Sequence, residues 1–228
     1  SLASLRLFAE LFVSEHALDT RFCMEIFSDL LKLASPPTEA MFPGLLQGLN
    51  NPRVAPFVLD YANFVFRKGL VLPHPASQQI QELTGLLSKL SERLGAIQDI
   101  RPETDDEARR LGKQVTEAVS LGVSLCDALA CIGDPIAVGA LNKALGVEHR
   151  RLRVEAAAAL AKLDVEDAKS LLAAMAADPI ERLRVLKYAE ELELLDSVAD
   201  EHCNIVAQAE AEFVTYLAQP TQFGIAPQ

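Results

Sequence analysis

An internal repeat in the second half of the chain is the feature that most constrains its fold. The tetrapeptide Arg-Leu-Arg-Val occurs at 151–154 and returns at 182–185, an offset of 31 residues. Small and apolar residues recur at the same offset: Leu129 and Leu160, Ile132 and Leu163, Ala137 and Ala168, Leu141 and Leu172, and Leu152 and Leu183. Such a period is typical of units that are pairs of helices, each stacking on its neighbours to bury its apolar face. The sequence therefore predicts an all-α fold.

The first part of the chain also has helical periodicity. Residues 20–34 place Phe22, Ile26, Leu30 and Leu33 on one stripe with a spacing near 3.6 residues. Prolines and the Asn50-Asn51-Pro52 turn separate this segment from two further helices, the last of which we expect to stop near Gly69. Residues 1–74 are therefore predicted to form helical hairpins.

The middle of the chain, residues 75–132, predicts a long helical hairpin. Apolar residues alternate in steps of three and four along a first helix of about 24 residues, at Ile80, Leu83, Leu87, Leu90, Leu94 and Ile97. A second helix repeats the alternation at Leu111, Val115, Ala118, Gly122, Leu125, Leu129 and Ile132, with Gly122 allowing close approach. The acidic connection at 99–109 is expected to be mobile, because it is charged and contains proline.

The repeated segment resembles HEAT repeats over about residues 123–198. An Ala-rich helix ends at Cys131-Ile132-Gly133 and Asp134-Pro135 opens the next, while Asp178-Pro179 is followed by Arg184 six residues after the Asp, as in the turn of that family. The resemblance implies a right-handed α-solenoid of antiparallel helix pairs, with HEAT repeats over 123–218. The last residues, 219–228, are expected to be an extended tail leading into a further C-terminal region.

Charge and composition narrow the possible partners. The net charge is −11, and no Lys or Arg follows Lys187, whereas 188–228 holds eight acidic residues. Such a field repels nucleic acid. No apolar run reaches the roughly 18 residues that a membrane span needs. The four scattered cysteines lack the paired spacing of a metal or disulfide framework. We expect a cytoplasmic protein with no nucleic-acid, membrane, metal or cofactor binding.

No catalytic motif is present in the sequence. GxSxG, Walker, GxGxxG and HExxH patterns are absent, and the four histidines are far apart. His74, between two prolines, is interpreted as a loop residue. We therefore expect that the chain is not an enzyme.

The basic residues of the repeat are the candidate partner-binding residues. They are Arg150, Arg151, Arg153, Arg182, Arg184 and Lys187. One hypothesis is a positive strip that holds an acidic or phosphorylated protein partner. The alternative is inter-repeat ion pairing with Glu148, Glu155, Asp178 and Glu181.

These observations favour a protein–protein interaction scaffold or adaptor. Two alternatives remain open. The helices could support an activity in a further C-terminal domain, or the chain could handle a ligand in the manner of the phycobilin lyases that share HEAT-type folds, which would need a concave pocket lined by Arg and aromatic residues.

Overall fold

A computed structural model of the chain describes residues 2–13, 32 and 37–218, and these residues form helices, turns and loops with no strand. The all-α prediction is confirmed. The helix predicted at 20–34, apart from Lys32, and the tail predicted at 219–228 lie outside the described residues.

The N-terminal helices are α1 (Leu2–Val13), α3 (Thr38–Leu45) and α4 (Ala55–Arg67), with the 3-10 helix η1 (Leu46–Asn50) between the last two. Helix α1 packs against α3, and η1 contacts α4. Pro56 lies in the first turn of α4, where a missing N–H costs nothing. Gly69, with φ +68°, follows the helix and donates its N–H to Phe66, so the chain turns at the predicted glycine.

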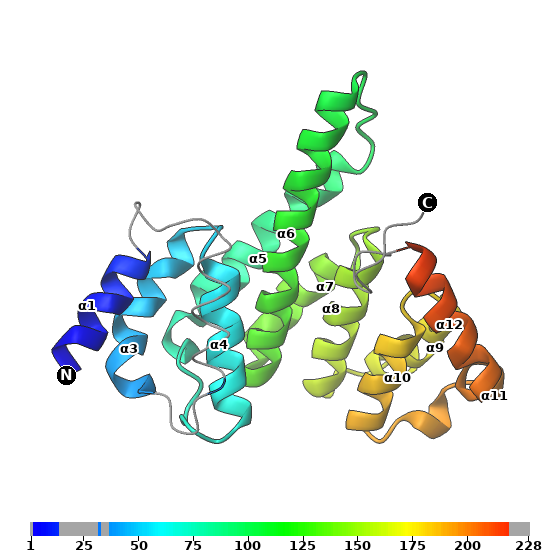
Figure 1. Cartoon of the computed structure of the whole chain (residues 1–228). Helices are drawn as coiled ribbons and strands as arrows, with labels where there is room; N and C mark the ends of the chain where they lie inside the picture. Colours follow the sequence, from blue (N-terminus) through cyan, green and yellow to red (C-terminus); the bar gives the residue numbers. More distant parts are fainter. Residues whose placement is uncertain (1, 14–31, 33–36, 219–228) are drawn as a thin grey trace.

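The long hairpin consists of α5 (Ile80–Ile97) and α6 (Asp105–Ile132), which pack against each other. Helix α5 has 18 residues and is shorter than predicted, because residues Ser77–Gln79 form the separate 3-10 turn η2. Its apolar seam is buried as expected at Leu83, Leu87, Leu90 and Leu94. The outer ends of both helices project beyond the rest of the molecule (Figure 1).

Helix α6 begins inside the segment that was predicted to be a connection, so the predicted limit at residue 109 is wrong. Thr104 accepts the N–H of Glu107 on its hydroxyl, and Glu107 accepts the N–H of Glu103 on its carboxylate. Thr104 is therefore the N-cap with Glu107 at the third helical position, which is the spacing of a capping box, and the acidic first turn interacts favourably with the helix dipole. The acidic residues that suggested a loop therefore start the helix.

Helix α6 is also, within the described part of the chain, the one helix long and apolar enough to cross a membrane. Nearly half of its apolar window, 44 %, is buried inside the protein. The inner half of α6 packs against α4, α5 and α8, so a core position accounts for this composition.

The second half of the chain continues with α7 (Val138–Leu145), α8 (Arg150–Lys162), α9 (Ala168–Ala174), α10 (Arg182–Glu191), α11 (Asp200–Cys203) and α12 (Ile205–Ala218). Short 3-10 helices, η3 (Pro135–Ala137), η4 (Met175–Ala177) and η5 (Leu195–Ser197), lie at the turns. Leu141 and Leu172, which occupy the same position of the repeat, are both fully buried, whereas Leu152 is fully buried and its equivalent Leu183 is only partly buried.

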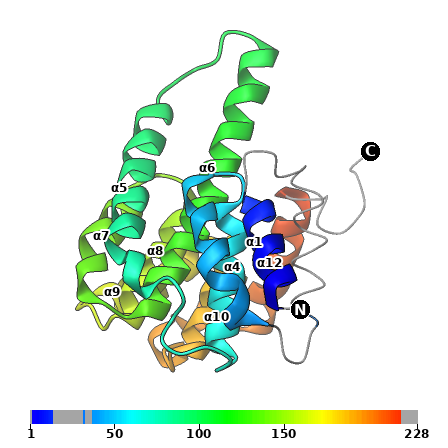
Figure 2. The same ribbon diagram turned by 90° about the vertical axis from the view of Figure 1, so that its left-hand side faces the viewer.

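The helices form two layers. In the first layer α4, α6, α8, α10 and α12 follow one another, each packed on the next (Figure 1). In the second layer α5 packs beside α7, and α9 lies on the same side (Figure 2). Helix α8 is central, and Ala156 through Ala161 are all buried in it. Alanine allows these helices to approach closely on several sides.

Candidate interaction surface

The six basic residues predicted from the repeat divide between two helices of the first layer. Arg150, Arg151 and Arg153 lie in the first turn of α8, and Arg182, Arg184 and Lys187 lie in α10. Their surroundings differ strongly, so the six do not form one uniform exposed strip.

Arg182 is a structural residue with a side chain only 5 % exposed. Its guanidinium donates to the backbone carbonyl of Ala176 at 2.8 Å, to that of Ala207 at 2.9 Å and to the carboxylate of Glu210 at 2.7 Å. These acceptors lie in η4 and α12, so Arg182 joins the last helix to the array. A partner has no access to this guanidinium, so the prediction that Arg182 is a partner-binding residue is wrong.

Arg184 also bonds within the molecule. Its Nη1 lies 3.0 Å from Glu155 of α8, and its Nε lies 3.1 Å from Glu181. The hydroxyl of Tyr188 donates to the second carboxylate oxygen of Glu155. Glu155 is 5 % exposed, and a buried carboxylate is tolerated only when such partners surround it. Burial and the Glu155 charge together raise the pKa of Tyr188.

The first turn of α8 has three exposed arginines, of which two form no ion pair with a described residue. Arg150 forms an ion pair with Asp178 at 3.0 Å, whereas Arg151 and Arg153 are exposed and form no ion pair with any side chain of the described residues. Arg150 and Arg153 line a small hollow of about 240 Å³ together with Asp178 and Glu181. Lys187 is exposed on α10.

A second polar group, which sequence reasoning missed, joins α4 to α6. Asn63 is 1 % exposed and donates through Nδ2 to the carbonyl of Ser124 at 3.3 Å and to Asp127 at 2.9 Å. Arg67 donates to the same carboxylate oxygen of Asp127. The residues of α4 and their partners in α6 are 60 or more positions apart in sequence, and no local spacing connects them.

His74 completes this group from the loop before α5. It is 2 % exposed, and its Nε2 lies 3.0 Å from Oδ1 of Asn63 while its Nδ1 accepts the N–H of Ala76. The interpretation of His74 as a loop residue holds, but the loop is fixed to the core. Burial lowers the pKa of His74 to about 4, so the ring is neutral at physiological pH.

A third link joins α8 to α10. Lys162 lies 3.5 Å from Glu191 and places its ammonium 5.1 Å from the ring centroid of Tyr188. Polar contacts therefore join α4 to α6 and α8 to α10 in the first layer, and we call the residues that make them the polar seam: Asn63, Arg67, Asp127, Glu155, Lys162, Arg184, Tyr188 and Glu191.

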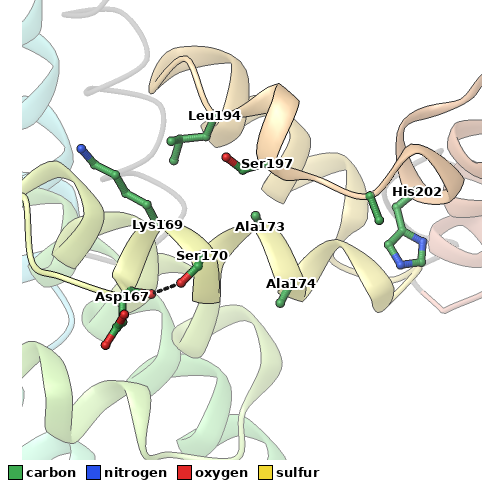
Figure 3. Close-up of a pocket in the computed structure, with 9 residues that line it drawn as sticks. Asp167, Lys169, Ser170, Ala173, Ala174, Leu194, Ser197 and His202 are labelled. Carbon is green, nitrogen blue, oxygen red and sulfur yellow. Dashed lines mark hydrogen bonds between the residues drawn. The ribbon is translucent and has the colours of Figure 1, made fainter.

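A hollow of about 660 Å³ lies between α9 and the segment that leads to α11. Figure 3 shows Ala173 and Ala174 between its polar groups, with Asp167 and His202 on opposite sides. Ser170 is occupied by a hydrogen bond to the carbonyl of Asp167. A nucleophile and a base must be within hydrogen-bond reach of each other, and these groups do not converge in that way.

A further hollow of about 540 Å³ combines basic and aromatic residues, as ligand handling would require. Phe64, Arg67 and Lys68 line it with Asp60 and Asp127. Arg67 is engaged by Asp127, and Lys68 lies over the Phe64 ring at 5.9 Å. The cations of this hollow are therefore held by protein groups. Among the described residues no group of three or more His, Cys, Asp or Glu is placed to hold a metal ion.

Ion pairs thus connect neighbouring helices of the first layer, and arginines are exposed at the start of α8. Comparison of the chain with protein-family models, with curated proteins and with solved structures gives no significant match.

Proposed function

We propose that this chain is a HEAT-type α-solenoid that acts as a non-enzymatic scaffold for protein–protein interaction. The observation that carries the proposal is the polar seam, whose side chains tie α4 to α6 and α8 to α10, while α6 packs directly against α8. A layer fixed in this way presents its remaining exposed groups in a constant arrangement, and preorganisation lowers the entropic cost of binding.

The turn before α10 supports the HEAT-type arrangement. Asp178 pairs with Arg150 at 3.0 Å, and Arg184, six residues after Asp178, pairs with Glu155 at 3.0 Å. The partners Arg150 and Glu155 both belong to α8, the corresponding helix of the preceding helix pair. The Asp and Arg of the turn thus contact the neighbouring repeat, as the resemblance implies.

The partner-binding part of the proposal is confined to the exposed cations. Arg151 and Arg153 remain on the surface, whereas Arg182 and Arg184 are occupied inside the array. An arginine not held by another side chain can bind a carboxylate or phosphate bidentately. The proposed ligand is therefore an acidic or phosphorylated segment of a protein, seated at the first turn of α8.

The test compares crosslinked complexes purified from the native host. Wild-type protein is compared with the variant Arg151→Glu/Arg153→Glu, and with the control Arg101→Glu/Arg110→Glu, which makes the same charge change at the exposed end of the long hairpin. We expect one stoichiometric protein partner that is lost only from the first variant. Equal capture of the partner by all three proteins would show that Arg151 and Arg153 do not bind it. A bound small molecule with no protein partner would contradict the scaffold function itself.

A further inference from the structure

Helix α12, the last helix of the described residues, has one side packed against other described residues and one side exposed. Ala207 and Ala211 are 6 % and 0 % exposed, and they lie on the side where Arg182 of α10 bonds to the Ala207 carbonyl. Helix α12 lies at one end of the molecule (Figure 1). Helices at the end of a repeat array need a polar outer side to remain soluble when nothing covers them.

The open side of α12 is apolar instead. Ile205 is 82 % exposed, Val206 is 74 %, Phe213 is 62 % and Leu217 is 59 %. Ile205, Ala209, Phe213 and Leu217 are spaced by four residues, so they form one continuous ridge along the helix. We call this ridge, with Val206, the α12 ridge. A ridge of this kind packs into the groove of another helix.

Acidic residues flank the α12 ridge on both sides. Glu212 precedes Phe213 on one flank, and Glu210 lies on the other, where it also meets Arg182. Glu210 is paired with Arg182 at 2.7 Å, whereas Glu212 forms no ion pair with a described residue, and the sequence after Lys187 contains no Lys or Arg. The flanking charge specifies what the ridge can accept.

We propose that the α12 ridge binds an amphipathic helix of a protein partner whose apolar stripe is flanked by Lys or Arg. The apolar stripe would cover Ile205, Phe213 and Leu217, and the basic flanks would meet Glu210 and Glu212. Two copies of α12 would bring acidic flanks together, and an anionic membrane surface would repel them. The surface shares no residue with the arginines of α8, so it is a second, independent binding site.

The probe is a synthetic peptide of Leu and Lys, about 18 residues or five helical turns long, with its leucines on one face. Two peptides serve as controls, one with Glu in place of Lys, and one with the same Leu and Lys composition in an order that gives no apolar face. We expect the first peptide to bind the whole chain at least about tenfold more tightly than either control, measured by fluorescence anisotropy.

Variants of the chain locate the binding. Phe213→Ser should weaken binding of the first peptide about tenfold, because an exposed anchor is removed without disturbing the core. Phe213→Leu should retain most of the affinity, and Glu212→Lys should lose it. Ile136→Ser, at a 51 % exposed apolar residue of η3, is the matched control and should bind as the wild type does.

Two results would overturn the proposal. One is equal binding of the peptide by wild type and Phe213→Ser, with both proteins shown by circular dichroism to be folded. The other is a dimer of the wild-type chain in sedimentation velocity that Phe213→Ser dissociates, which would assign the ridge to a second copy of this chain.

Discussion

Nε2 of His74 lies 3.0 Å from Oδ1 of Asn63, and this contact fixes the protonation of the ring. Nδ1 of His74 accepts the N–H of Ala76, so Nε2 carries the proton and donates it to Asn63. The amide of Asn63 then donates to Asp127 and to the Ser124 carbonyl. The loop before α5 is thereby connected to α4 and α6 through one directed series of hydrogen bonds.

The neutral state of His74 predicts a pH dependence of stability. Its pKa is about 4 in the folded protein and about 6.5 in an unfolded chain, so the unfolded state takes up the proton first as the pH falls. Protonation of His74 in the unfolded chain should therefore lower the free energy of unfolding by about 3 kcal/mol as the pH falls from 6.5 to 4. Above pH 6.5 it should have no effect.

Chemical denaturation at a series of pH values tests this expectation. The slope of the free energy of unfolding against pH should be smaller in His74→Gln than in wild type over the same window, even if the variant is less stable throughout. Identical slopes for the two proteins would show that His74 does not stay neutral in the fold.

The buried carboxylate of Glu155 predicts a strong coupling with Arg184. Removing Arg184 leaves a carboxylate that is 5 % exposed without its cation, so Arg184→Ala should destabilise the protein by about 2 to 4 kcal/mol. Replacing both residues, as Glu155→Gln/Arg184→Met, should cost less than the two single changes added together.

The exposed pair of Lys143 and Glu92 is the control for this experiment. Its side chains are 52 % and 63 % exposed, and surface ion pairs contribute little. Lys143→Ala should leave the denaturation midpoint almost unchanged. A comparable loss for Lys143→Ala and Arg184→Ala would mean that burial of Glu155 is not what makes its pair important.

Glycines in the two long helices are expected to differ in their tolerance of substitution. A Cβ on Gly122 would lie 2.8 Å from Cδ1 of Leu152 and 3.3 Å from Cδ2 of Leu90, whereas a Cβ on Gly85 would have nothing within 4 Å. Gly85→Ala should stabilise α5 by about 0.5 to 1 kcal/mol, because it lowers the entropy of the unfolded chain.

In α6, replacing Gly122 with a β-branched residue should be unfavourable. Gly122→Val should cost about 2 kcal/mol through crowding against α5 and α8. Thermal unfolding of the two variants provides the measurement. A stable Gly122→Val protein would show that the close approach of α6 and α8 is not required.

Arg182 is expected to control the attachment of α12. Arg182→Met keeps the length of the side chain but loses the bonds to Ala176, Ala207 and Glu210. Buried carbonyls left without a donor should cost about 3 kcal/mol. Hydrogen exchange should accelerate in α12 first, while α4 keeps its protection; equal acceleration in both helices would argue against a local role.

Much of the helical arrangement could be predicted from the sequence alone, because apolar periodicity and turn residues are local signals. The repeat at an offset of 31 residues, the seam of α5 and the turn at Gly69 all correspond to structural features. The start of α6 was missed although a local signal was present: Thr104 and Glu107 have the spacing of a capping box.

Only the tertiary structure decided which polar residues are buried and which are free. Arg182 and Arg184 follow the same sequence pattern as Arg151 and Arg153, yet Arg182 and Arg184 pair with Glu210 and Glu155, whereas Arg151 and Arg153 are exposed and form no ion pair with a described residue. The burial of His74 likewise depends on Asn63 and Asp127 of other helices. A sequence specifies each side chain and its local spacing, but the energy of a charge depends on the groups that folding brings around it.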